Sequence, residues 1–406
     1  MIPSAENGKP KSGSRKDLNF SWILRFAVLC LLASSILCCR QESPSSATKT
    51  LEDAPAVVSY PDQPAAPGTK LLFKEDLRIH REGWWPQSVL LDPDGRILIS
   101  TYRENKIYIY DQSGRESGTM EFPEGQGPGE FFSMEAQLST NGDLYIYDRL
   151  QQRLSIIGLK DEAVKTVMKF GEMRWVFTIA PNGEYYFWIV RFRSGSKDIQ
   201  DLVLSRFNGS AKLVKEYESY PYAPARSDQK GMRIYGLYAP YGIYKVDPAG
   251  NLYVAFSDRY EIRVYSPEGS LLRRIVNKTQ PREPNEKDLI NIRSYFSEFP
   301  KSQTTLIPPT QMPAIADILI LSDSSLLVVT FDPSEDEGTL YADWFSPEGR
   351  FLSRQKIPKY YLWFKAFGPD RSHAVFVGDH FYAIEPTDET EDDFVVKRYK
   401  VQIGNY

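Results

Sequence analysis

The feature that most constrains this chain is an internal repeat of strand, tight turn and strand. It reads SVLLDPDGRILIS at 88–100 and returns at 136–148, 178–192, 243–256 and 317–330, with a degenerate sixth copy over 362–386. In each copy Tyr, Val, Ile and Leu alternate with polar residues, which is typical of strands in sheets packed face to face. The turns combine Pro, which presets φ, with Gly, which takes the left-handed conformation. The chain therefore predicts a repeating β-architecture.

The spacing of the repeat predicts the number of blades. The landmark turn residues are Gly95, Gly142, Gly183, Gly250, Ser324 and, near the end, about Ser372. Three of the five intervals lie near the period of a four-stranded propeller blade, and the other two correspond to a blade plus an insertion. We expect an all-β fold, a six-bladed β-propeller of four-stranded antiparallel blades. An N-terminal strand at 69–79 would close the ring as the outer strand of the last blade and remove the open edges. A β-sandwich gives no reason for such a period.

One linker between repeats carries a family resemblance. EGQGPGEF at 124–131 leads into LSTNGDLYIYD and then RLSIIG. This succession resembles the NHL repeat, and the GQGPGEF block is similar to six-bladed propeller lipoproteins of Bacteroidota. The resemblance covers about residues 69–401. It implies the fold and says little about activity, because one fold serves many functions.

The N-terminus has the pattern of a targeting segment. Several Lys and Arg residues precede an uncharged run from Phe26 to Cys39, which is short for a membrane span. All three cysteines lie in this segment, and Cys38 or Cys39 at its end resembles the lipidated residue of a bacterial lipoprotein signal. Lipidation, plain cleavage and membrane retention stay open. We expect an exported protein of the periplasm or cell surface, with a targeting segment at 1–39, a Pro/Ala/Ser-rich linker at 40–68 and the propeller at 69–406.

Composition and motifs exclude several functions. Lys and Arg number 49 against 53 Asp and Glu, the net charge is −4, and no long basic run occurs, so nucleic acid is not an expected partner. The body has no Cys for disulfides or metal sites, and only His80, His373 and His380 are available, too few and too scattered for an imidazole metal centre. No nucleophile or phosphate-binding motif stands between a strand and a helix. We therefore expect a binding protein rather than an enzyme.

The pattern of connections predicts where a ligand would bind. Connections between first and second strands, and between third and fourth strands, are tight turns. The long connections belong to the other class, and they are 191–201, 218–240, 277–313, 332–338 and 387–393. They should emerge on one loop-rich face, which would bind a protein, peptide or carbohydrate. The Tyr-rich stretch 218–241 either packs onto the blades or contacts this ligand, and 284–299 has the apolar spacing of a capping helix.

Candidate ligand contacts lie where inner strands begin, at the mouth of the channel, and in the adjoining loops. They are Glu82, Trp85, Glu135, Arg174, Trp175, Tyr238, Tyr241, Asp317 and Lys365. No cofactor is expected for a binding function. The alternative is a divalent-metal-dependent lactonase or esterase at the channel mouth. REGWWP resembles the start of the gluconolactonase family, which implies a possible Ca²⁺ site with Glu82, Glu135 and Asp317 as oxygen ligands.

Overall fold

The computed structural model describes residues between 56 and 405, with several gaps. The chain divides into residues 1–50 and 51–406, and the described residues all belong to the second unit. They are 56–58, 69–101, 104–192, 200–222, 225–227, 233–278, 281–286, 288–289, 304–362, 373–387 and 393–405. The predicted targeting segment, with Cys38 and Cys39, lies outside these residues, and its boundaries stay a prediction. Within the described ranges, no helix combines the length and apolar character needed to cross a membrane.

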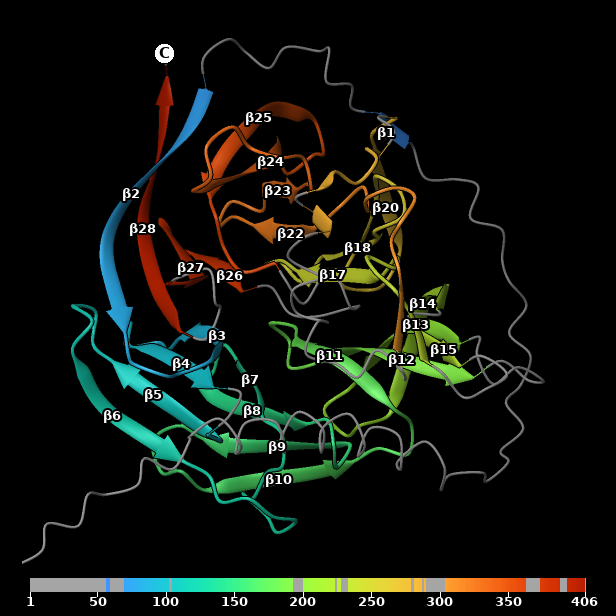
Figure 1. Cartoon of the computed structure of the whole chain (residues 1–406). Helices are drawn as coiled ribbons and strands as arrows, with labels where there is room; N and C mark the ends of the chain where they lie inside the picture. Colours follow the sequence, from blue (N-terminus) through green and yellow to red (C-terminus); the bar gives the residue numbers. More distant parts are fainter. Residues whose placement is uncertain are drawn as a thin grey trace, which may run out of the picture. The chain divides into compact units, whose positions relative to one another are not determined.

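The described strands form six four-stranded antiparallel blades, as predicted (Figure 1). Blade 1 contains β3 (Pro86–Leu91), β4 (Ile97–Thr101), β5 (Lys106–Tyr110) and β6 (Glu116–Glu121). Blade 2 contains β7 (Glu135–Leu138), β8 (Asp143–Asp148), β9 (Arg153–Gly158) and β10 (Val164–Lys169). Blade 3 contains β11 (Arg174–Ile179), β12 (Tyr185–Phe192), β13 (Gln200–Phe207) and β14 (Leu213–Tyr222). Blade 4 contains β17 (Gly242–Val246), β18 (Leu252–Phe256), β19 (Glu261–Tyr265) and β20 (Leu271–Val276). Blade 5 contains β22 (Asp317–Ile320), β23 (Leu326–Val329), β24 (Thr339–Phe345) and β25 (Phe351–Pro358). Blade 6 contains β26 (Ala374–Val377), β27 (His380–Pro386), β28 (Phe394–Asn405) and β2 (Thr69–His80). The first strand of each blade contacts the first strand of the next, so these strands form the inner ring.

The N-terminal strand closes the ring, which confirms the prediction. β2 pairs antiparallel with β28 from Thr69 opposite Asn405 to His80 opposite Val395. The last blade therefore takes three strands from the C-terminus and its outer strand from the N-terminus. Such closure covers an edge of β28 that would otherwise be open.

The tight turns use the landmark residues because their backbone is left-handed. Gly95, Gly142, Gly183 and Gly250 have φ between 77° and 87°, and Ser324 has φ of 63° at the equivalent place. The sixth landmark, about Ser372, is wrong. The turn between the first two strands of blade 6 lies at Gly378, where φ is 60°. The stretch FGPDRS resembles the other turns, and this similarity displaced the prediction.

The hydrophobic core is divided among the junctions between blades. The described apolar residues form six clusters, and each cluster draws on two neighbouring blades. At the junction of blades 4 and 5, for example, Ile262 and Val264 pack with Leu326 and Val328, all of them buried. Because alternate residues of a strand point to opposite faces, each blade can supply both of its junctions. This arrangement makes the blades a rigid support for their connections.

Two further pairings were not predicted. A small sheet contains β15 (Ala225–Ser227), β16 (Arg233–Gly236) and β21 (Thr304–Ile307), which come from the two longest insertions. In addition, β1 (Ala56–Val58), inside the predicted linker, pairs parallel with β20 at the outer edge of blade 4. The predicted capping helix falls mostly on residues that the structure does not describe.

Candidate functional site on the loop-rich face

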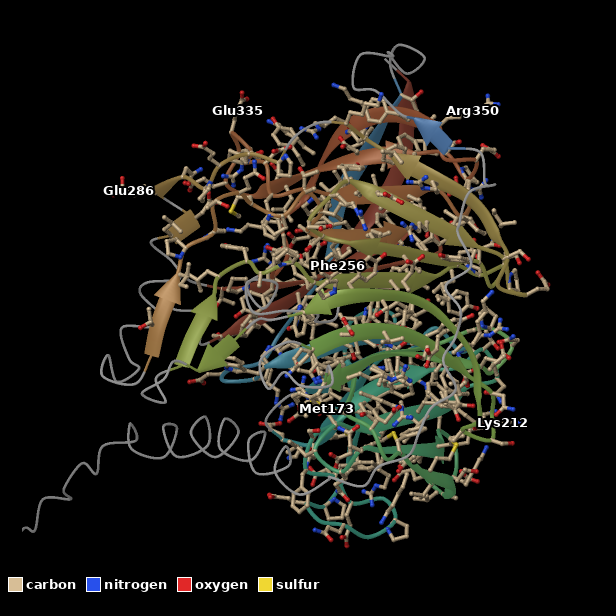
Figure 2. The ribbon with its side chains drawn as sticks, turned by 90° about the vertical axis from the view of Figure 1, so that its right-hand side faces the viewer. Met173, Lys212, Phe256, Glu286, Glu335 and Arg350 are labelled. Carbon is tan, nitrogen blue, oxygen red and sulfur yellow. The ribbon has the colours of Figure 1, made fainter. Side chains whose placement is uncertain are left out.

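The two faces of the ring differ in the length of their connections. Tight turns such as 208–212 and 346–350 lie on one face, which we call the tight-turn face, and the opposite connections form the loop-rich face. Figure 2 shows Lys212 and Arg350 on one side of the molecule, and Glu286 and Glu335 on the other. β16 and β21 pair in parallel, from Arg233 opposite Thr304 to Gly236 opposite Ile307. The two longest insertions therefore lie together on the loop-rich face.

The connection between blades 1 and 2 is closed by its own hydrogen bonds. Arg153, 1% exposed, donates from Nη1 to the carbonyls of Gln126 (2.8 Å) and Gly127 (2.9 Å), and from Nη2 to that of Glu130. The Glu130 carboxylate turns back to accept from the Gly127 amide at 2.7 Å. A Cβ on Gly127 would come within 2.9 Å of the Glu130 carboxyl carbon. The glycines of GQGPGE therefore provide backbone space and do not form a ligand cradle.

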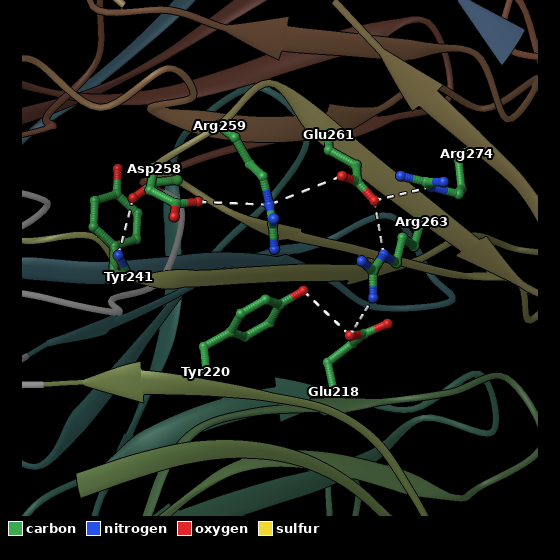
Figure 3. A network of polar contacts seen from close by, with 9 residues as sticks. Glu218, Tyr220, Tyr241, Asp258, Arg259, Glu261, Arg263 and Arg274 are labelled. Atoms are coloured by element: carbon green, nitrogen blue, oxygen red, sulfur yellow. Dashed lines mark hydrogen bonds and ion pairs between the residues drawn. The ribbon is translucent and has the colours of Figure 1, made fainter. Parts of the chain in front are cut away.

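A network of charges joins blades 3 and 4 below the loop-rich face (Figure 3). Glu218 is buried and accepts from Arg263 at 2.6 Å, from Tyr265, and from Tyr220 at 3.4 Å. Arg263 also donates to Glu261 at 2.8 Å. Burial alone would lower the pKa of Arg263, but its hydrogen bonds to Glu218 and Glu261 outweigh this and raise it. The guanidinium is therefore firmly charged and fixes the position of one blade against the other.

The network ends in an exposed pair on the connection between β18 and β19. The Nε atom of Arg259 lies 3.8 Å from both Asp258 Oδ1 and Glu261 Oε2, beyond hydrogen-bonding distance. The side chains of Asp258 and Arg259 are 44% and 52% exposed. Partial burial raises the pKa of Asp258. This pair is available to a ligand on the loop-rich face, whereas Glu218 and Arg263 are occupied.

A pocket opens on the other side of blade 4, at its junction with blade 5. Its enclosed volume is about 30 Å³, so the pocket is a shallow recess of the surface. The lining residues come from the two blades and from the 277–316 insertion, and they are Tyr260, Asn277, Pro281, Arg282, Pro313, Ala314, Thr330, Phe331, Asp332 and Arg354. The Phe331 ring contacts Tyr238, which follows β16, at 5.3 Å between centroids. The pocket therefore lies next to the small sheet formed by the insertions.

Two arginines, each paired with carboxylates, fix the polar walls of the pocket. Arg354 donates to both Asp343 oxygens, at 2.7 and 3.2 Å, and to Asp332 at 2.8 Å. Arg282 forms a bidentate pair with Asp288, at 2.6 and 2.9 Å, and donates to the carbonyl of Phe331. Bidentate pairs of this kind fix direction as well as distance. The pocket thus offers a preorganised mixture of aromatic, guanidinium and carboxylate groups.

Three predicted site residues occupy the positions that the sequence assigned to them. Glu135, Arg174 and Asp317 are the first residues of β7, β11 and β22. Glu135 is 6% exposed, Arg174 is 5% exposed, and Asp317 is fully buried. The Arg174 guanidinium carbon lies 4.1 Å from the centre of the Phe170 ring, and burial lowers the pKa of this arginine. Asp317 accepts from the hydroxyl of Tyr360 at 3.1 Å. Because these three side chains are buried, their exposure does not support a role in ligand contact. That role stays a prediction.

The other predicted contacts are dispersed. Glu82 is exposed between β2 and β3, and Trp85 packs half-buried on Phe394. Half-buried Trp175 packs on buried Tyr222. Lys365 lies outside the described part of the chain.

The Tyr-rich stretch is mainly packed onto the blades. Tyr241 is fully buried and donates to the Ala316 carbonyl at 2.7 Å, and Tyr220 and Tyr222 are buried as well. Half-buried Tyr238 is the member of the predicted set that adjoins the pocket. The packing interpretation is therefore confirmed for three of these tyrosines.

The carboxylates of the metal alternative do not fit a divalent cation. Glu82 lies on the β2–β3 connection, Glu135 on blade 2 and Asp317 on blade 5. Asp317 already accepts from Tyr360 and lies 4.0 Å from the Lys245 ammonium. Across the described residues, no three His, Cys, Asp or Glu side chains come together as a possible metal site. The donor set that Ca²⁺ requires is thus not assembled by these residues.

Sequence reasoning missed the pocket residues. Phe331, Asp332 and Arg282 lie in or beside long connections that were predicted, so their presence on the loop-rich face could have been anticipated. Arg354 could not, because it comes from the outer strand β25, and its pairing with Asp332 depends on how β24 and β25 register. No short motif marks these residues.

Comparison with known proteins relates the chain to other structures only distantly. No protein-family model matches the chain, and no curated protein matches its sequence. A candidate exported protein from Bacteroides fragilis is 13% identical over 86% of this chain and 99% of that chain, with a TM-score of 0.48. Virginiamycin B lyase from Staphylococcus aureus is 11% identical over 82% and 99% of the two chains, with a TM-score of 0.42. A protein of unknown function from Bacteroides caccae is 14% identical over 72% and 94%, with a TM-score of 0.38. The NHL character of the repeat stays a prediction.

Proposed function

We propose that this protein is an exported, membrane-tethered and non-catalytic propeller that binds a protein, peptide or carbohydrate. Binding takes place on the half of the loop-rich face formed by blades 3, 4 and 5. The observation that carries the proposal is the pairing of β16 with β21, which joins two separate insertions into one small sheet. Ordering insertions of this length costs conformational entropy, and neither insertion is needed to complete a blade. Long connections held on a rigid scaffold are where binding sites are usually built.

The pocket at the junction of blades 4 and 5 supplies the chemistry for binding. Phe331 and Tyr238 offer ring surface, and the Arg354–Asp332 ion pair, whose side chains are 41% and 36% exposed, offers charged groups beside it. A peptide or a sugar carries the same mixture of groups, with apolar faces next to hydroxyls or amides. Because arginine–carboxylate pairs already fix the walls, the side chains of the pocket lose little conformational entropy when a ligand binds.

Catalysis by a metal-dependent lactonase or esterase is not favoured. The three carboxylates it requires are on separate elements, and two of them are buried. Export and tethering are supported by the N-terminal pattern of basic residues, an uncharged run and Cys38 and Cys39. A binding protein held at a membrane needs only such an anchor and an accessible face.

The test uses the purified full chain with two probes, an array of defined oligosaccharides and a displayed peptide library. For a probe that binds, we expect Phe331→Ala to raise Kd at least tenfold, because the change removes the ring from the pocket wall and keeps the backbone carbonyl that Arg282 holds. The matched control is Leu213→Ala, an exposed apolar residue (44%) that follows a tight turn on the opposite face. Equal weakening by both changes, or by the control alone, would contradict the proposed site.

A further inference from the structure

A short strand from the predicted linker is bound at the rim of blade 4. β1 pairs with β20 through Ala56 opposite Arg274, Val57 opposite Ile275 and Val58 opposite Val276. Blade 4 is consequently five-stranded, in the order β1-β20-β19-β18-β17 (Figure 1). An outer strand presents a row of backbone groups that accept an added strand. Here the residues that fill the edge come from the same chain.

The pairing fixes the direction in which the chain approaches the propeller. β20 follows the tight turn at 266–270 and ends at Val276, where the long insertion begins on the loop-rich face. Because β1 runs parallel to β20, Ala56 is the end of β1 nearer the tight-turn face. β2 has the same polarity, since Thr69 pairs with Asn405 at the end of β28, and β28 begins next to the loop-rich connection at 387–393. The chain therefore enters both strands from the tight-turn side.

We propose that the outer edge of β20 is the docking site for the segment preceding the propeller. This docking holds the tight-turn face toward the membrane and turns the loop-rich face outward. The inference rests on the tether of the proposed function and adds its geometry. Its consequence is that the pocket and the small sheet face the ligand and not the lipid.

The length of the remaining linker supports this orientation. Docking leaves residues 40–55 between Cys39 and β1, whereas an undocked linker would comprise 40–68. Docking therefore removes thirteen residues from the tether. Docking thus shortens the reach of the tether and sets its point of attachment on one side of the disc. The turns on that side, such as DPDG and SPEG, are polar, so this face would stand off the bilayer without inserting.

The experiment compares the distances of the two faces from a membrane. The full chain is reconstituted into phosphatidylcholine–phosphatidylglycerol vesicles that contain a headgroup spin-labelled lipid. A fluorophore is attached through a genetically encoded non-natural residue, either in place of Glu348 in a tight turn or in place of Glu335 on the loop-rich face; both side chains are exposed. We expect the label at position 348 to be quenched at least twofold more strongly than the label at position 335. Equal quenching, or stronger quenching at position 335, would overturn the inference.

A pair of variants tests whether β1 sets this difference. Val57→Pro with Val58→Pro removes two consecutive amide donors, one of which must face β20. It should reduce the difference in quenching without abolishing it, because the longer, released tether still enters β2 from the tight-turn side. The matched control, Val57→Thr with Val58→Thr, keeps both amides and should keep the difference. If the proline pair leaves the difference unchanged, β1 does not direct the tether. If the wild-type chain fails to float with the vesicles, the tether of the proposed function is itself wrong, which is a distinct result.

Discussion

Blades 1 and 2 and blades 3 to 5 are built from the same repeat but use their connections differently. In the first pair, the polar side chains of the repeat close the connection on itself, as Arg153 does with three carbonyls of the 124–131 linker. In the second group, Arg282 and Arg354 bind the connection at 331–332 from two sides and line the pocket beside it. The difference shows that a buried arginine such as Arg153 completes a blade junction, whereas the partly exposed Arg282 and Arg354 support a surface. Binding sites should therefore be sought where polar side chains are not needed to complete a blade junction.

The strongest way to break this comparison is Arg153→Met, which we expect to lower the free energy of unfolding by about 3 kcal/mol. The change leaves three partly buried carbonyls of the linker without their donor, while the methionine keeps much of the side-chain volume. Denaturant unfolding followed by tryptophan fluorescence measures the effect. Arg115→Met is the control, because this side chain is 85% exposed, and it should change stability by less than about 0.5 kcal/mol. Binding of any probe found for the pocket should persist in folded Arg153→Met protein.

Glu218→Gln tests the corresponding junction in the other group of blades. The amide keeps the shape of the buried carboxylate but leaves the partly buried Arg263 guanidinium with less compensation of its charge. We expect a loss of about 2 kcal/mol in the free energy of unfolding, less than for Arg153→Met because Arg263 retains Glu261. Glu268→Gln, at a tight turn, serves as the exposed control in the same denaturation assay. A loss that equals or exceeds that of Arg153→Met would show that the two junctions do not differ in the expected order.

The closure of the ring provides a third region for the comparison, and it should respond to acid. Burial raises the pKa of Asp76, but hydrogen bonding and charge from Arg398, together with His380, outweigh it and lower that pKa below 3.8. Asp393 behaves in the same way through His80, whose Nε2 lies 2.6 Å from its carboxylate. A lowered folded-state pKa adds stability above the unfolded value, and this stability is lost as the pH falls through the folded value. Asp76→Asn should therefore flatten the fall in unfolding free energy below pH 3.8, measured by denaturant titration between pH 2.5 and 5. Asp323→Asn, at an exposed turn, serves as the control substitution in the same measurement.

The sequence predicted the features of the fold that the repeat encodes and missed those that depend on pairing between insertions. Alternating strands and Pro-Gly turns identified six blades, the closing strand and the inner-strand positions of Glu135 and Asp317, because these features are local and periodic. β16 and β21 are short, come from separate insertions and pair through their backbones, and backbone pairing leaves no periodic pattern in the sequence. β1 lies in a Pro-rich segment and was hidden for the same reason. The pocket brings residues of two blades and one insertion together, and such long-range contacts could not be located beforehand.

The smallest expected effect concerns the landmark turn of blade 5, where Ser324 stands in place of glycine. Its φ of 63° puts a Cβ in the left-handed region that Gly95, Gly142 and Gly250 occupy without cost. Ser324→Gly keeps the turn hydrogen bond from this amide to the Leu321 carbonyl, 3.0 Å long, and removes the strain. Part of the gain is offset by the greater freedom of glycine in the unfolded chain, so we expect about 0.5 kcal/mol of added stability by thermal and denaturant unfolding. Ser322→Gly in the same turn is the control, since it adds the same freedom without relieving a positive φ, and it should lower stability. If both changes had the same sign, the left-handed turn would not be what the repeat selects at this position.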